Sequence, residues 1–182
     1  MALKLTTSYL EDSLALFRQY KGMTDKAIEQ VTDEQLFEAL DSEGNSIAIL
    51  VKHMAGNMRS RWTGFPEADG EKPDRHRDTE FEDPPTTRAA LLALWEDGWC
   101  HVFAALEPLT DADLSRTTYI RGEAHSVMQA IHRQVGHYAC HCGQIVFLAK
   151  HFNADKWQSL TIPRGQSEEF NRRVGGQEDS QR

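Results

Sequence analysis

Histidine is the residue type in this sequence whose spacing points most clearly to chemistry. His137 and His141 are four positions apart in a segment with apolar residues at helical spacing, so both imidazoles should lie on one face of a helix, one turn apart. Two rings placed in this way can reach a single metal ion. The pair flanks the apolar stripe of its segment, which is where a site at the rim of a bundle core would lie.

Two histidines seldom suffice, because a catalytic divalent ion usually takes three protein ligands and keeps one position for water. His53 is the best third candidate, since it lies in the middle of another helical segment beside an apolar stripe. Residue types and spacing alone leave two interpretations open: three histidines around one metal ion, or histidines that only pack or face solvent. The other five histidines fall in loops, near helix ends or on an opposite helix face and are not expected to be ligands: His76, His101, His125, His132 and His151.

Long helices must position these three histidines. Capping-box patterns, in which a Ser or Thr precedes a Glu or Gln by three positions, mark helix starts at Ser8, Thr32 and Ser126. Apolar periodicity and turn residues predict one long helix that starts near residue 8, further long helices at about 46–62, 87–106 and 126–152, and short ones at 32–40 and 109–114. The sequence therefore predicts an all-α fold, an up-down four-helix bundle with short extra helices.

The chain of 182 residues is long enough for one domain with a substantial core. We expect that single domain to span residues 1–171, and a Gly-, Gln- and charge-rich polar C-terminal tail, residues 172–182, to be disordered. Trp157, Leu160 and Ile162 follow the last long helix with nothing sequential to cover them. They predict an exposed apolar patch of the kind that marks a homodimer interface.

Composition excludes several classes of function. The formal charge of −8 argues against nonspecific nucleic-acid binding, which needs Lys and Arg to neutralise phosphates. The sequence contains no apolar run near the roughly 20 residues that span a membrane, and its start does not resemble a secretory signal. The three cysteines are therefore expected to be free thiols in a reducing compartment, the cytoplasm. Cys140 and Cys142 point about 200° apart on a helix, so they cannot share one ion and are expected to be buried.

The histidine arrangement resembles the DinB/YfiT-like superfamily of four-helix-bundle metalloproteins, in which one histidine lies on the second helix and a His-x-x-x-His pair lies late on the fourth. The strings at 51–62, 69–73 and 162–171 resemble one uncharacterised branch, and the resemblance extends to about Asn171. It implies three histidines on one divalent ion, commonly nickel, zinc or manganese, and frequent homodimers. The superfamily includes mycothiol-dependent maleylpyruvate isomerase and bacillithiol transferases, but no reaction carries over for this branch.

Two classes of function follow. In the first, the three histidines hold the ion of a metal-dependent enzyme, of thiol S-transferase or hydrolase type, with a small-molecule thiol or electrophile as its partner. In the second, the protein binds metal without turnover, as a binding or structural protein linked to stress. An open coordination position beside a ligand-sized pocket favours the first class, and a closed, saturated ion favours the second.

Two polar residues on the expected helices are candidates for supporting roles at the site. Asn57 lies one turn after His53 and could bond a substrate or a metal-bound water, or simply pack. Gln144 lies about one turn from the histidine pair and is expected to orient an imidazole from behind. No catalytic base or nucleophile stands out.

A polar loop at 67–85 is long for a compact domain, and such loops are more often functional or mobile than idle. It leaves the end of the helix that carries His53, so we expect it to border the site. Arg75 and Arg77 of this loop, together with Arg121, could hold an anionic substrate with their forked donors, or could be solvated charges.

Overall fold

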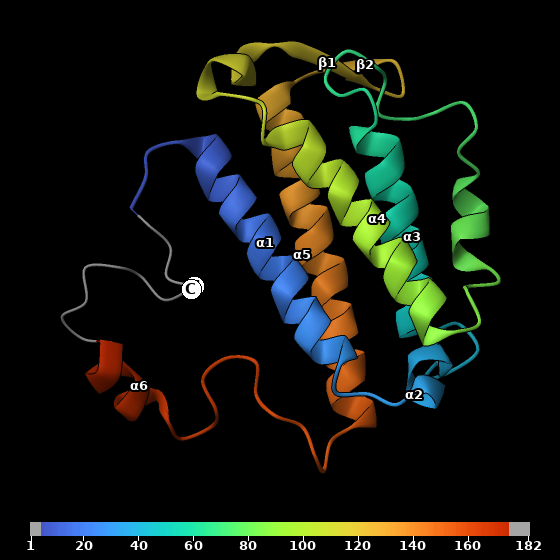
Figure 1. The fold of residues 1–182 in the computed structure, drawn as a ribbon, viewed down its shortest axis with the longest axis vertical. Helices are drawn as coiled ribbons and strands as arrows, with labels where there is room; N and C mark the ends of the chain where they lie inside the picture. The colour runs from blue at the N-terminus through green and yellow to red at the C-terminus, as the bar shows by residue number, and fades with distance from the viewer. Residues whose placement is uncertain (1–4, 175–182) are drawn as a thin grey trace.

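Four long helices form a bundle in the computed structural model of the chain, which describes residues 5–174 (Figure 1). They are α1 (Tyr9–Ile28), α3 (Ile47–Trp62), α4 (Arg88–Leu106) and α5 (Val127–Phe152), with a short α2 (Asp33–Phe37) before α3. The most extensive contacts join α3 to α4 and α1 to α5, and α3 also packs on α5. The predicted all-α bundle is confirmed, and no helix within residues 5–174 is long and apolar enough to cross a membrane.

One connection differs from the predicted up-down order. Two contacts show that the helices α3 and α4 run parallel. Arg59 pairs with Asp97, and one turn further along both helices Thr63 contacts His101. A chain can join two parallel helices only by returning along their length, and residues 63–87 form this crossover beside α3 (Figure 1). The long polar loop of the sequence therefore has a structural reason as well as any functional one.

Side-chain caps begin the long helices close to the predicted positions. Each capping hydroxyl accepts a hydrogen bond from the main-chain N–H three residues later, and the caps are Ser8, Ser46, Thr87 and Ser126. The capping box at Thr32 begins α2, which ends at Phe37 rather than at the predicted residue 40. Because a cap sets where a helix begins, the caps of α3 and α5 help to fix which of their residues face one another.

A small antiparallel hairpin lies at the end of the bundle where α5 begins. β1 (Thr117–Ile120) pairs with β2 (Glu123–Ser126), and the two turn residues between them, Arg121 and Gly122, both have positive φ. The sequence analysis identified no strands here, because four residues are too few to show an alternating pattern. The short helix expected at 109–114 is present as a 3-10 turn at Asp111–Ser115.

The segment after α5 also differs from expectation. Trp157 and Leu160 pack against the core, and only Ile162, which is 39% exposed, remains of the apolar patch that predicted a homodimer. A further helix, α6 (Ser167–Val174), follows in the polar segment and lies apart from the bundle in Figure 1. The tail expected at 172–182 thus begins inside α6, and its remainder, 175–182, lies outside the described residues.

The core that supports the middle of the bundle is aromatic. Phe17, Trp62, Trp99 and Tyr138 are buried and pack with ring centroids 5.5 to 6.5 Å apart. Trp62 Nε1 donates to the Tyr138 hydroxyl at 2.9 Å, and that hydroxyl donates to Asn57 Oδ1 at 3.3 Å. Aromatic packing and these two hydrogen bonds together hold α3 against α5 beside the candidate ligands.

Candidate metal centre

Three imidazoles converge between the middle of α3 and the middle of α5. His53 Nε2 lies 3.3 Å from His137 Nε2, which lies 3.1 Å from His141 Nε2. His53 is buried and the other two are partly buried. The structure therefore brings together the three histidines that the sequence singled out, and this is the one such group of potential ligands among residues 5–174.

Each of the three rings has an oxygen acceptor at its other nitrogen. The Nδ1 partners are Glu80 Oε2 for His53 at 2.8 Å, Gln134 Oε1 for His137 at 3.3 Å and Gln144 Oε1 for His141 at 2.8 Å. An oxygen acceptor calls for an N–H donor, so these contacts assign the proton to Nδ1 in every ring. The three Nε2 atoms then face one another with lone pairs and no proton between them. Such an arrangement is repulsive by itself and is stabilised by a cation.

The carboxylate behind His53 comes from the crossover and not from the bundle helices. Glu80 lies in a short 3-10 helix (Arg77–Phe81), and the guanidinium of Arg75 donates to both its oxygens, at 2.8 and 2.9 Å. Phe81 stacks on the His53 ring with centroids 4.6 Å apart. Burial by itself raises the pKa of Glu80, but the bonds from His53 and Arg75 outweigh it and lower that pKa below its usual value. Glu80 is therefore an ionised, fixed acceptor that orients His53.

Two residues of α3 hold the crossover at this point. Lys52 Nζ donates to the main-chain oxygens of Thr79 and Glu82, at 2.6 Å each. One turn later, Gly56 leaves space for Glu80, because a Cβ atom there would lie 2.5 Å from Glu80 Oε1. Glycine inside a helix costs roughly 0.5–1 kcal/mol relative to alanine. Close approach of the carboxylate is the physical reason for glycine at this position.

The surroundings keep the histidine pair neutral. Burial is the main cause that lowers the pKa of His137 to about 3, and the electrostatic effects of the His141 and His53 rings and of the Arg61 and Arg75 guanidinium groups add to it. Burial is also the main cause that lowers the pKa of His141. Neutral imidazole is the form that binds a metal ion, so protons compete weakly for these two rings near neutral pH.

The other residues that the sequence analysis singled out take different positions. Gln144 contacts His141, whereas Asn57 is buried and accepts from Tyr138. Arg75 is committed to Glu80, and Arg77 is half exposed with its guanidinium over the Phe81 ring. Their roles toward a substrate remain predictions.

The sequence analysis missed two of the three oxygen acceptors. Gln134 precedes His137 by three positions, as Gln144 follows His141 by three, and this spacing could have identified it. Glu80 is 27 positions from His53 in a segment without periodicity, and no pattern in the sequence indicates that the two meet.

A cavity of about 410 Å³ lies between the segment at 40–45 and the helices α3 and α5. Its wall includes Gln144, which contacts Nδ1 of His141, but none of the three histidines lines it. Its volume is typical of small-molecule sites. Cys140 also lines it and is exposed, which corrects the expectation that Cys140 and Cys142 are both buried, since only Cys142 is.

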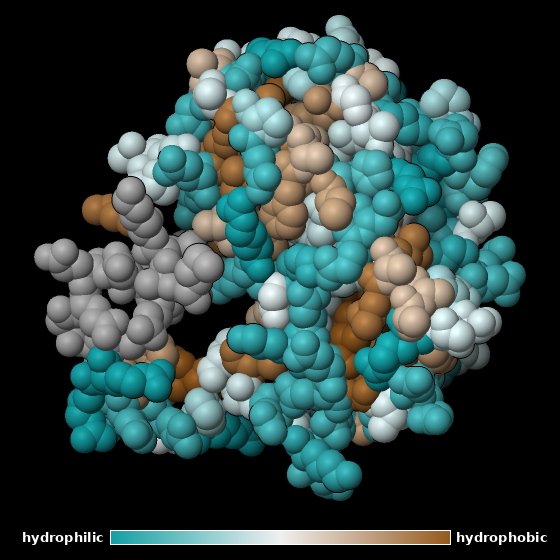
Figure 2. Space-filling model, viewed as in Figure 1, coloured by the Kyte–Doolittle hydropathy of each residue, from teal (hydrophilic) through white to brown (hydrophobic). Residues whose placement is uncertain are grey.

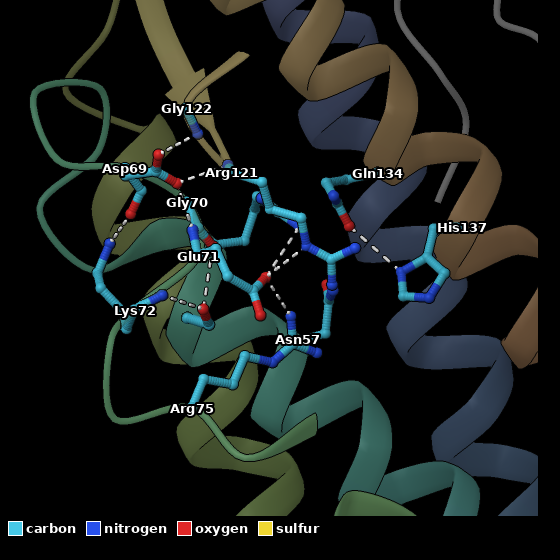
Figure 3. Close-up of polar contacts among 12 residues, drawn as sticks. Asn57, Asp69, Gly70, Glu71, Lys72, Arg75, Arg121, Gly122, Gln134 and His137 are labelled. Atoms are coloured by element: carbon cyan, nitrogen blue, oxygen red, sulfur yellow. Dashed lines mark hydrogen bonds and ion pairs between the residues drawn. The ribbon is translucent and has the colours of Figure 1, made fainter. Parts of the chain in front are cut away.

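A cluster of charged residues lies near the end of α3 (Figure 3). The carboxylate of Glu71 faces three guanidinium groups, those of Arg75 at 3.0 Å, Arg121 at 3.5 Å and Arg61 at 4.0 Å. Asp69 accepts the main-chain N–H groups of both turn residues of the hairpin, at 2.9 and 2.7 Å. Figure 3 also shows the Gln134 amide turned toward His137 beside this cluster.

Comparison with known proteins supports the fold but supplies no reaction. A family described as "Protein of unknown function (DUF1572)" matches residues 4–166. No curated protein matches the chain. The crystal structure of a DinB-like protein from Bacillus cereus ATCC 10987 is similar, with a TM-score of 0.61 and 16% sequence identity over 81% of this chain and 94% of that chain. The family match confirms the expected uncharacterised family, and the crystal structure shows that the chain shares the fold of a DinB-like protein.

Proposed function

The chain belongs to the DUF1572 family of proteins of unknown function, and we propose that it is a metal-dependent enzyme that binds one divalent ion through His53, His137 and His141. The observation that carries the proposal is the convergence of three Nε2 lone pairs in rings whose opposite nitrogens are all engaged. The DinB-like fold, in which such sites are expected, supports it further.

The spacing of the ring nitrogens fits an ion. Zinc–nitrogen bonds are about 2.0–2.1 Å long, so two imidazole nitrogens on one tetrahedral ion lie roughly 3.3 Å apart. The separations from His137 Nε2 to the other two Nε2 atoms are 3.3 and 3.1 Å. All three ligand atoms lie within 4.8 Å of one another, so a small rotation of one ring completes the set. Imidazole ligands suit nickel and zinc better than manganese, and those two metals come first in any test.

The bound ion would supply Lewis-acid chemistry, because three neutral imidazoles leave its two positive charges free to lower the pKa of a thiol or a water. The residues of the chain prepare this site. Glu80 and two glutamine amides fix the three rings, and burial keeps His137 neutral. The cavity beside Gln144 gives room for a small organic molecule.

Three protein ligands leave room for a substrate in the coordination shell. No carboxylate or thiolate within residues 5–174 joins the three histidines, and the nearby Glu80 is engaged at the Nδ1 side of His53. We therefore propose a reaction of thiol S-transferase or hydrolase type on a small thiol or electrophile, in the cytoplasm. The alternative is a metal-binding protein without turnover.

The proposal includes a homodimer. Figure 2 shows hydrophobic side chains between α1 and α4, on a face that is otherwise largely hydrophilic. Leu92 and Phe103 of α4 are among the hydrophobic residues that are only partly buried. Homodimers are also what the family resemblance implies. Light scattering at micromolar concentration should give twice the chain mass, and a monomeric mass would contradict this part of the proposal.

Metal content is the first experiment. Elemental analysis after extensive dialysis should find about one divalent ion per chain, and a His137→Ala, His141→Ala double variant should retain none. The matched control is His132→Ala, because His132 is an exposed histidine of the same helix. Stoichiometric metal in the double variant would overturn the ligand assignment.

Turnover is the second experiment. Low-molecular-weight thiols and the electrophile monochlorobimane are offered to metal-loaded protein, metal-stripped protein and the His53→Ala variant. We expect reaction only with the metal-loaded protein. Equal rates in all three would exclude metal-dependent thiol transfer to this acceptor, and a tightly held but unreactive ion across acceptors would favour the non-catalytic alternative.

A further inference from the structure

Arg61 is a buried charge that the histidine site does not explain. Its side chain is only 5% exposed, near the end of α3. Its Nε and Nη1 atoms are buried, and neither hydrogen-bonds any of the residues that the structure describes. Buried guanidinium groups normally use their donors, because a charge without partners is costly to bury.

Arg61 shares a helix face with the metal centre. His53, Asn57 and Arg61 follow one another at intervals of four residues, which places them on one face of α3. At 1.5 Å per residue, Arg61 is about 12 Å along the helix from His53.

The acid that faces Arg61 is shared with other arginines. Glu71 faces it at 4.0 Å, but the same carboxylate also faces Arg75 at 3.0 Å and Arg121 at 3.5 Å. Glu80 has its oxygens engaged by Arg75 and by a ring of the metal centre. Among the described residues Arg61 therefore has no carboxylate of its own at hydrogen-bond distance, and a small anion would supply one.

We propose that Arg61 anchors an anion-binding subsite, which takes a carboxylate or phosphate group of a substrate whose reacting end lies at the metal centre. The role of this ligand as substrate rests on the function proposed above, whereas anion binding itself does not. A planar guanidinium with free donors suits a small oxyanion.

The arginines that the sequence suggested for this task are less suitable, and Arg121 among them is 58% exposed. Arg75 already uses its donors on Glu80 and Glu71. Arg77 is half exposed and lies over an aromatic ring. Arg61 combines burial with unused donors, which is the combination that a specific anion site needs.

A purely structural role is the competing explanation, since Arg61 lies against the crossover. A Cβ atom on Gly70 would lie 2.6 Å from Arg61 Nη1, so the two residues are in close contact. However, the Gly70 carbonyl accepts its side-chain hydrogen bond from the Ser60 hydroxyl, at 3.0 Å, and not from Arg61. A structural arginine at this place would be expected to make such a bond itself.

Calorimetric titration of the full-length, metal-stripped protein tests the proposal. Phosphate and succinate are titrated separately at constant ionic strength set with chloride, so that a tetrahedral phosphate is compared with planar carboxylate groups. We expect one saturable site per chain for at least one of them, at least tenfold weaker in Arg61→Met. The matched control is Arg59→Met, which removes an exposed arginine of the same helix and should bind like the wild type.

Thermal melting separates the two roles of Arg61. Without anion, Arg61→Met should melt no lower than the wild type, because the variant removes an unpaired buried charge. If Arg61→Met does not fold, Arg61→Lys keeps the charge, loses the fork and should bind the anion more weakly than the wild type. The absence of saturable binding, or equal binding by the variants, would overturn the subsite. Because these titrations contain no metal, a protein that binds the anion but no metal would overturn only the function proposed above.

Discussion

Replacing Glu80 with glutamine separates the charge of this residue from its shape. Glu80→Gln keeps an oxygen acceptor for His53 but removes the negative charge that Arg75 holds. The side chains of Glu80 and Arg75 are only 9% and 6% exposed, and breaking a buried ion pair costs about 3–5 kcal/mol. Because the amide still accepts one bond and Arg75 keeps Glu71, we expect the free energy of unfolding to fall by about 3 kcal/mol.

Metal affinity should fall as well, because the ring of His53 loses its charged acceptor. Loss of such a partner typically weakens metal binding about 10–100-fold, which is about 1.4–2.7 kcal/mol. A chromophoric chelator competes for zinc with the wild type, Glu80→Gln and Glu82→Gln, the last being an exposed acid of the same crossover. Wild-type affinity in Glu80→Gln would refute our reasoning that Glu80 orients His53.

Three further substitutions test other contacts. Gly56→Ala should push Glu80 off His53 and weaken metal binding in the same chelator competition, although alanine favours the helix. Its control, Gly136→Ala in the open part of α5, should raise the free energy of unfolding by roughly 0.5–1 kcal/mol and leave metal affinity unchanged. Gly70→Ala should displace the Arg61 guanidinium, and calorimetry should then show weaker anion binding than in the wild type; unchanged binding would place the anion elsewhere. Cys142 should resist a thiol reagent in the native protein, while the two exposed cysteines, Cys100 and Cys140, react. Burial raises the pKa of Cys142 from 9.0 to about 11, so its thiol favours the folded state below pH 9 and this contribution is lost as the pH rises to 11. Urea titrations at pH 8 and pH 10.5 should therefore show a larger loss for the wild type than for Cys142→Ala, and equal losses would contradict the shift.

Local patterns in the sequence predicted much of the fold and the three histidines that converge at the candidate site. Ser126 begins its helix with a complete capping box, because that motif involves only residues three apart. At Ser8 only the hydroxyl cap forms, since the Glu11 carboxylate accepts from Thr6 instead. The convergence of His137 and His141 follows from helical geometry alone, and His53 was found because a histidine beside an apolar stripe must lie near the core.

Contacts that depend on the path of the chain could not be predicted in this way. Nothing in the sequence fixes α4 as parallel to α3, and this direction makes residues 63–87 return along α3. Glu80 reaches His53 only because of that return. Burial of Arg61 depends on the same path, since Gly70 of the crossover covers it.

The crossover gives the candidate metal centre a property that a site built only from bundle helices would lack. Its 3-10 segment is held by Lys52 and by the hydrogen bond that His53 donates to Glu80, and Thr79 within the segment is exposed. Local opening of this segment removes the hydrogen-bond acceptor of His53. A ligand that binds the ordered histidine therefore disfavours opening, and opening weakens binding of that ligand by the same factor. A protease should therefore cut the chain near residue 79 more slowly when the candidate centre is occupied than when it is empty.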